Sequence, residues 1–312
     1  MYIATLTSIL AFFIIFSTGF FDIVFTLKDY HGALERIIAS HASRPAGRLP
    51  ESGDKPVQKK AEPFNLESVC GTIMDTGSGA FLFGKEARKE WPIASITKLA
   101  TALVFLNHNP GWEEVYTIKD EDRREGGRIN VFKGDRVKVN DLFNLSLVGS
   151  DNTATIALVR STGMSEEEFV QKMNETAEAF GLDNTRFFDA VGLSNDNVST
   201  AREVAKLAQS ALAKAEIREA TLKKKHEFFT LGGKKIIVYN TDDLLHNFPQ
   251  NGLKIQGGKT GYTESAGYCF VGKFMAQAGR EIISVVLGSP DRDSRFSQTK
   301  DLVEWAYKNF IW

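Results

Sequence analysis

The apolar residues of this chain fall into three successive patterns. Residues 1–27 are apolar almost throughout and contain no charged side chain before Asp22. Residues 28–63 change to a composition rich in proline, glycine and charge, which is most marked from Ala42 onward. From Phe64 to the end, short apolar runs alternate with apolar residues at helical spacing. The chain therefore divides into an apolar leader (1–27), a polar linker (28–63) and a folded region (64–312).

The leader has the composition of a secretory signal or a membrane anchor. No clear A-x-A cleavage site follows it, which favours a retained anchor. The basic residues Lys28, Arg36 and Arg44 all follow the segment, and by the positive-inside rule they favour a folded region on the cytoplasmic side. The linker cannot bury enough apolar surface to fold alone, so we predict a flexible tether over residues 28–63.

Short apolar runs predict strands near both ends of the folded region. The first two flank a turn at residues 76–79 and predict a hairpin. The glycine-rich stretch 251–263 is predicted as a turn that leads into a later strand. The predicted strands cover residues 69–75, 80–83, 136–139, 235–240, 266–274 and 281–289.

Helical patterns fill the middle of the folded region and return at its end. Leu99, Leu103 and Leu106 repeat at helical spacing with alanines between them, which predicts a helix buried on most sides. The predicted helices cover residues 94–108, 141–148, 153–160, 165–181, 200–213 and 294–310. Strands, then helices, then strands and a last helix predict an α+β fold, with an antiparallel sheet built from both chain ends and flanked by helices.

Composition narrows the possible functions. The formal net charge is −1 and no basic face stands out, so we expect no nucleic-acid partner. The two cysteines, Cys70 and Cys269, lie in apolar strand-like stretches, and we expect two buried free thiols. No Cys/His cluster offers metal ligands, so we expect neither a metal nor another cofactor.

The first candidate for chemistry is the pair Ser95 and Lys98, in the motif S-x-x-K. Residues three apart lie on one helix face, so the hydroxyl and the amine are neighbours. A serine becomes nucleophilic when a base takes its proton, and burial lowers the pKa of a lysine enough for it to be that base. The motif recurs at Ser52 and Ser297, in the linker and in a polar helix turn, where the lysine would stay protonated.

The second candidate is the triplet Ser150, Asp151 and Asn152, between two predicted helices. A short polar loop there can present a hydroxyl and a carboxamide to a cleft. The same residue types are also common in ordinary turns, so the triplet alone favours the turn.

The third candidate is the triplet Lys259, Thr260 and Gly261, which follows a glycine-rich stretch. Lysine and a hydroxyl can hold a carboxylate, and glycine lets another molecule's backbone lie close to a strand. The alternative is a hairpin turn with a solvated lysine.

The order of the three motifs is more specific than any one of them. One S-x-x-K opens a buried helix, one S-x-N lies between helices, and one K-T-G lies on a late strand, an arrangement known from penicillin-binding proteins and class A β-lactamases. From about Leu66 to Phe310 the chain resembles the serine D-Ala-D-Ala carboxypeptidases, the low-molecular-mass penicillin-binding proteins. The stretches that carry the resemblance are WPIASITKLATALV, GLDNTRFFDAVGL, STAREVAKLA and GGKTGYTESAGYCFVG.

The resemblance implies a β-lactamase/transpeptidase-like fold with an all-helical lobe, and a serine D,D-peptidase domain over residues 64–312. It implies that Ser95 is acylated, that Lys98 is its base and that Ser150 relays a proton to the leaving amine. The implied substrate-binding residues are Asn152, Lys259, Thr260, Gly261, Tyr262 and Arg295. Of these, Tyr262 would form the oxyanion hole through its backbone N–H together with that of Ser95.

The implied reaction removes the terminal D-Ala of peptidoglycan stem peptides ending in D-Ala-D-Ala, through an acyl-enzyme that β-lactam antibiotics also form. Such a substrate lies in the cell envelope, so we expect an extracytoplasmic enzyme held at the cytoplasmic membrane by its N-terminal segment. Arg295 would help to hold the substrate carboxylate; the alternative is a solvated arginine at a helix end.

Two features leave alternatives open. The middle motif reads S-D-N, as in β-lactamases, where carboxypeptidases often have S-G-N, yet no E-x-x-L-N stretch lies between Ser150 and Lys259 to activate a deacylating water. The chain ends soon after its last predicted helix, where many carboxypeptidases continue into a β-rich domain. A D,D-endopeptidase of cross-links, a β-lactamase and a non-catalytic cell-wall binding module therefore remain alternatives.

Overall fold

The computed structural model describes residues 55–59, 62–248, 252–276 and 279–312. The predicted apolar leader at 1–27 and the first part of the predicted tether lie outside this description. Within the described ranges, no helix combines the length and the apolar character needed to cross a bilayer.

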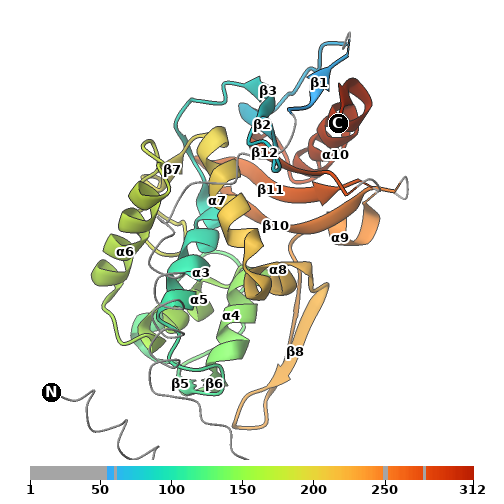
Figure 1. The fold of residues 1–312 in the computed structure, drawn as a ribbon. Coiled ribbons are helices and arrows are strands. Elements are labelled where there is room, and N and C mark those ends of the chain that lie inside the picture. The colour runs from blue at the N-terminus through green and yellow to red at the C-terminus, as the bar shows by residue number, and fades with distance from the viewer. Residues whose placement is uncertain (1–54, 60–61, 249–251, 277–278) are drawn as a thin grey trace, which may run out of the picture. The chain divides into compact units, whose positions relative to one another are not determined.

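A five-stranded antiparallel sheet joins the two ends of the folded region (Figure 1). The strand order is β10-β11-β12-β2-β3, so the late strand β12 pairs with the early strand β2. The bounds are β2 Cys70–Asp75, β3 Phe81–Lys85, β10 Lys254–Thr263, β11 Gly267–Met275 and β12 Glu281–Ser289. This confirms the predicted α+β fold with a sheet made from both chain ends.

Helices cover both faces of the sheet (Figure 1). The last helix, α10 (Ser294–Asn309), contributes Leu302, Val303 and Ala306 to a buried cluster with residues of β11 and β12. On the other face, α7 (Ala201–Ala213) packs against β12, β2 and β11. The sheet is therefore buried on both sides, which explains why its central strands read as continuous apolar runs.

The middle of the chain forms a helical lobe with two small hairpins. Its helices are α3 Lys98–Asn107, α4 Val139–Val148, α5 Asn152–Ser161, α6 Glu166–Ala179 and α8 Ala215–Leu222. The hairpins are β5 Val115–Thr117 with β6 Arg136–Lys138, and β8 Lys225–Phe229 with β9 Lys235–Tyr239. The remaining short elements are β1 Val57–Gln58, β4 Trp91–Pro92, η1 Ala94–Thr97, η2 Asp120–Asp122, β7 Val198–Ser199, α9 Leu244–Asn247 and β13 Phe310–Ile311.

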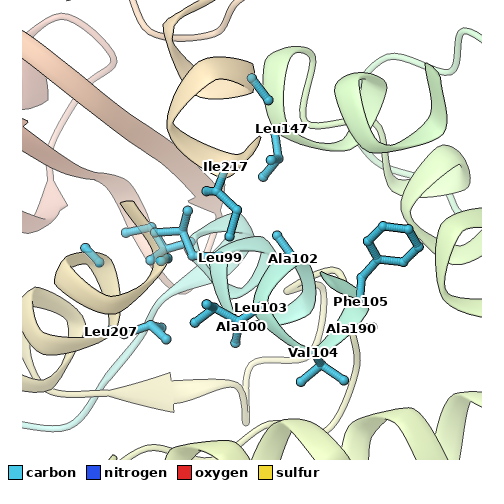
Figure 2. Close-up of a cluster of buried hydrophobic side chains, with 14 of the residues drawn as sticks. Leu99, Ala100, Ala102, Leu103, Val104, Phe105, Leu147, Ala190, Leu207 and Ile217 are labelled. Carbon is cyan, nitrogen blue, oxygen red and sulfur yellow. The ribbon is translucent and has the colours of Figure 1, made fainter. Parts of the chain in front are cut away.

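Helix α3 lies at the centre of the main hydrophobic core. Its residues from Lys98 to Phe105 are all buried. Figure 2 shows side chains of this helix beside Leu207 of α7 and Ile217 of α8, with Leu147 of α4 also in the cluster. The predicted helix buried on most sides is confirmed, and any polar group at its start is removed from bulk water.

The structure corrects two predictions at the level of local elements. The stretch 251–263 was predicted as a turn that gives way to a strand at the K-T-G triplet, but the strand β10 already begins at Lys254, because pairing with β11 along the whole strand outweighs the low strand propensity of its glycines. Residues 57–58, assigned to the tether, form the strand β1 and pair with β13. Cys70 and Cys269 are free and buried, as predicted.

Candidate active site

Ser95 and Lys98 meet at the start of the buried helix. Ser95 lies in the 3-10 turn η1, and Lys98 is the first residue of α3. The Lys98 Nζ atom lies 2.9 Å from the Ser95 Oγ atom. The turn begins at Ala94, whose φ of 47° is a costly conformation for a residue with a side chain. The predicted pair is therefore assembled, at a locally strained turn.

Lys98 is fully buried and its partners are neutral. Besides Ser95, Nζ donates to the Asn152 Oδ1 atom at 2.7 Å and to the Val191 carbonyl at 2.7 Å. Burial lowers the pKa of Lys98 to about 7, although the carboxylates of Asp189 and Asp151 partly oppose this shift. Near neutral pH a large fraction of Lys98 is therefore the free amine, which can accept the serine proton.

The Val191 carbonyl is held in place by a tight turn that the sequence analysis did not single out. The Asp189 carboxylate accepts the backbone N–H groups of Val191 at 2.7 Å and Gly192 at 2.5 Å. Gly192 has a φ of 86°, and a Cβ there would lie 2.0 Å from the Ala94 carbonyl oxygen. The turn thus packs directly beneath η1, and it lies within the stretch GLDNTRFFDAVGL that carries the family resemblance.

The loop between α4 and α5 presents Ser150 and Asn152. Ser150 has a φ of 58°, which turns the chain sharply after Gly149. Asn152 begins α5, and its Nδ2 atom donates to the Gly126 carbonyl at 2.9 Å while its Oδ1 atom accepts from Lys98. In this structure Asn152 orients Lys98 and fastens the loop that contains Gly126.

Asp151, the unusual middle residue of the triplet, has a structural role. It caps α5 by accepting the Ala154 N–H at 2.8 Å, and its other oxygen accepts both the backbone and side-chain N–H groups of Asn130 at 2.8 Å. Burial raises the pKa of this carboxyl group. Asp151 is fully buried and therefore supports the site from behind.

The third motif lies on β10, which is an outermost strand of the sheet. The Lys259 Nζ atom donates to the Ser150 Oγ atom at 2.8 Å and to the Thr260 carbonyl at 3.0 Å. Burial lowers the pKa of Lys259 well below its ordinary value, and the positive charges of Lys98 and Arg295 lower it further. The structure thus links the second and third motifs through one buried amine.

Gly261 lets β10 touch the serine turn. A Cβ at this position would lie 2.8 Å from the Ile93 carbonyl oxygen and 3.3 Å from the Ser95 backbone nitrogen. The backbone at residues 261 and 262 therefore adjoins the Ser95 N–H. The Tyr262 side chain is half exposed and stacks on Tyr268, with ring centroids 4.2 Å apart.

Thr260 and Arg295 occupy one end of the cleft. The Thr260 hydroxyl lies 2.6 Å from the Thr241 hydroxyl, a partner that the sequence analysis missed. Arg295 is buried, donates to the Gly261 carbonyl at 3.3 Å and lies over the Tyr268 ring. It is therefore not the solvated helix-end arginine of the alternative interpretation. Beside them, burial raises the pKa of Asp242 to about 7.

A cleft of about 590 Å³ runs along these groups. Ser95, Ser150, Thr260, Gly261, Tyr262 and Arg295 all line it, together with residues 127–128, 130, 149, 237–241, 243, 246 and 292. Lys98, Asn152 and Lys259 lie immediately behind this surface. Within the described residues, no group of three His, Cys, Asp or Glu side chains is arranged to hold a metal ion.

The arrangement combines the parts needed for nucleophilic acyl transfer. A serine hydroxyl touches a buried amine of lowered pKa, and a second hydroxyl touches a second buried amine. A threonine hydroxyl and a guanidinium lie at one end of the same cleft, where they can bind a carboxylate. The three motifs, more than 150 residues apart from first to last, thus converge on one site.

Comparison with known protein families agrees with this geometry. A family model described as peptidase S11, D-alanyl-D-alanine carboxypeptidase, matches residues 57–291. A D-alanyl-D-alanine endopeptidase of Pseudomonas aeruginosa is 31% identical over 261 residues, which cover 80% of this chain and 81% of that protein. One of Haemophilus influenzae is 37% identical over 182 residues, covering 58% of this chain and 61% of the relative, so the match spans less than two thirds of that protein.

Further relatives include carboxypeptidases and solved structures. The D-alanyl-D-alanine carboxypeptidase DacF of Bacillus subtilis is 26% identical over 258 residues, covering 81% of this chain and 65% of the relative. The Streptomyces K15 DD-transpeptidase matches with a TM-score of 0.73 and 27% identity, over 80% of this chain and all of that structure. Penicillin-binding protein D2 of Listeria monocytogenes, solved with cefotaxime bound, matches with a TM-score of 0.68 and 29% identity, over 79% of this chain and 99% of that structure.

Proposed function

Because this chain belongs to the peptidase S11 family of serine D,D-peptidases, we propose that it hydrolyses the amide bond on the carboxyl side of a D-Ala in peptidoglycan peptides. The observation that supports this most directly is the 2.9 Å contact between Ser95 Oγ and the buried Lys98 amine, beside a cleft that Thr260 and Arg295 also line.

In the proposed first step, the neutral amine of Lys98 takes the proton of Ser95, and Oγ attacks the D-Ala carbonyl carbon. The developing oxyanion is held by the backbone N–H groups of Ser95 and Tyr262, whose chain segments are brought together at Gly261. Donors of this kind contribute on the order of 3 kcal/mol to lowering the barrier.

In the proposed second step, the amide bond breaks and the leaving amine receives a proton through Ser150. Lys259 supports this relay because its Nζ atom already donates to Ser150 Oγ. Thr260 and Arg295 hold the carboxylate next to the scissile bond. A water molecule, activated by Lys98, then hydrolyses the acyl-enzyme. A direct contact of Asn152 with the substrate amide remains a prediction, since its side chain contacts Lys98 and Gly126 here.

The preferred bond is the finer part of this proposal. The motifs led us to expect release of the terminal D-Ala, the carboxypeptidase reaction. Two D-alanyl-D-alanine endopeptidases are 37% and 31% identical and a third is 28% identical, whereas the carboxypeptidases DacA, DacC, DacD and DacF are 26–29% identical. His246 and Arg292 also line the cleft, whose volume of about 590 Å³ has room for more than one alanine. We therefore favour cleavage of D-Ala cross-links, with terminal D-Ala removal as the second activity.

Two alternatives have less support. A β-lactamase needs a group that activates water for rapid deacylation, and the lining of the cleft in the described structure offers a single carboxylate, Asp243. A non-catalytic binding module would not need a buried lysine of lowered pKa against a serine. β-Lactams are accordingly expected to acylate Ser95 and to be released slowly, as inhibitors.

The cellular setting is also a proposal. Cross-linked peptidoglycan lies outside the cytoplasm, so this activity requires an extracytoplasmic location. The apolar residues 1–27 are suited to export and to anchoring at the cytoplasmic membrane, with residues that follow as a tether.

Digestion of purified peptidoglycan tests which bond is cut. The protein is incubated with sacculi, and the muropeptides are separated by chromatography and identified by mass. Conversion of cross-linked dimers to monomers supports the endopeptidase, and loss of one alanine from pentapeptides supports the carboxypeptidase. The proposed function would be contradicted if the wild type formed neither product and the Ser95→Ala variant behaved like the wild type.

A further inference from the structure

One wall of the cleft is formed by a strand that has an unpaired edge. The hairpin β8–β9 is a two-stranded sheet, so β9 has β8 as its only strand partner in the described structure. Ile237, Val238 and Tyr239 of β9 line the cleft. The outermost strand of the main sheet, β10, lines it as well, through Thr260 and Gly261. An unpaired strand edge is a template for an added extended chain.

The register shows which backbone groups of β9 are unpaired. The Thr230 N–H donates to the Lys234 carbonyl, and the Asn240 N–H donates to the Lys224 carbonyl. Bonded pairs alternate with non-bonded pairs along an antiparallel ladder, so the pair Glu227 and Ile237 between these points is non-bonded. The N–H and carbonyl of Ile237 therefore point away from β8, and those of Tyr239 do the same.

The hairpin is held firmly beside Ser150. Val238 packs on Gly149 so closely that a Cβ at the glycine would lie 2.2 Å from the valine Cγ2 atom. His226 of β8 bonds to Asp141 of α4 at 2.8 Å. The Thr241 N–H, just after β9, donates to the Val148 carbonyl at 3.2 Å. The unpaired edge thus has a fixed position relative to the second motif.

We propose that the free edge of β9 binds the leaving peptide of a cross-linked substrate in extended form. This inference rests on the proposed function, because Thr260 and Arg295 would hold the carboxylate next to the scissile bond. The Thr241 hydroxyl touches Thr260, so β9 ends where that carboxylate would lie, and a chain continuing from it meets Ile237 and Tyr239.

The charge of this part of the cleft fits the same occupant. Arg128 and Arg292 line it, and the Arg292 guanidinium is paired with Asp243 at 2.9 Å. A diamino acid fits as the leaving residue. Its acylated amine lies next to one carboxylate, and the rest of its chain carries further charged groups. A single leaving D-Ala would not reach this edge, so β9 is expected to distinguish the two substrate classes.

The test replaces the outward N–H of β9 without touching the catalytic groups. Ile237→Pro removes that donor at a non-bonded edge position, where proline is tolerated. Glu227→Pro is the matched control, because it makes the same change at the paired position on the opposite edge of the hairpin. Rates are compared for a cross-linked peptide dimer, for diacetyl-Lys-D-Ala-D-Ala and for acylation by penicillin, which also reports correct folding.

We expect Ile237→Pro to lower kcat/KM for the dimer about tenfold, because the substitution removes one hydrogen bond to the substrate. The rates with the short peptide and with penicillin should stay within about twofold of the wild type, and Glu227→Pro should leave all three unchanged. An unchanged ratio of dimer to short-peptide cleavage in Ile237→Pro would overturn the inference.

A binding experiment separates this inference from the proposed function. Fluorescence anisotropy measures binding of a labelled, uncleaved dimer to Ser95→Ala, with and without Ile237→Pro. Weaker binding of the double variant supports the role of β9 even if the wild type proves inactive, and equal binding contradicts it. Failure of the wild type to react with penicillin would instead contradict the proposed function. If Ile237→Pro does not fold, Tyr239→Pro makes the equivalent change two residues later.

Discussion

Two buried lysines lie behind the cleft, one on the helical side, at the start of α3, and one on the sheet side, on β10. Their surroundings differ. Lys98 begins a helix in the centre of the core and contacts the nucleophilic candidate Ser95. Lys259 lies on an outermost strand and contacts Ser150. Burial lowers the pKa of both, but Lys259 is lowered further by the positive charges of Lys98 and Arg295. Burial therefore favours the neutral form of each amine, and the hydroxyl that each amine contacts, Ser95 or Ser150, sets its proposed role.

Substitution of Lys98, at the start of helix α3, should cause the larger loss of activity. Lys98→Ala removes the base for Ser95, so we expect acylation by penicillin to slow on the order of 10³-fold or more, as general-base removal does. Intact-mass spectrometry over time measures the adduct. Lys300→Ala is the matched control, because Lys300 belongs to the second S-x-x-K sequence of the folded region, on α10. Normal acylation of Lys98→Ala would show that the base is another group.

Substitutions beside the sheet should lower activity less than substitution of Lys98, and they should affect substrate binding more than the chemical step. Arg295→Gln removes the guanidinium that lies beside Thr260, so we expect kcat/KM for a peptide substrate to fall about tenfold to a hundredfold, mainly through KM. Steady-state kinetics measure the split between KM and kcat. Arg295→Lys should restore part of the loss. A fall in kcat alone would place Arg295 in the chemical step and remove the distinction between the helical side and the sheet side.

The fold and the three motifs were predictable because their signals are local. Ser95 and Lys98 are three residues apart, so helix geometry alone makes them neighbours. The apolar runs of β2 and β12 reflect burial on both faces and predict strands wherever they pair. The order of the three motifs along the chain then indicates the family more specifically than any single motif does.

The remaining parts depend on contacts between distant segments. The Val191 carbonyl reaches Lys98 across 93 residues, and its own sequence gives no polar side chain to notice. Thr241 matters because it meets Thr260, which follows from the packing of β9 on α4. The first part of β10 was predicted as a turn because its glycines are typical of turns. The structure shows instead that Gly261 allows the strand to approach η1 closely.

The pH dependence of acylation at Ser95 tests most directly whether Lys98 acts as a neutral base. Because its pKa is lowered to about 7, the neutral fraction and hence the acylation rate at saturating penicillin should rise about tenfold per pH unit from pH 5 and level off above pH 7. A rate that is independent of pH from 5 to 8, or one that still rises steeply above pH 8 towards the ordinary lysine pKa, would contradict the account.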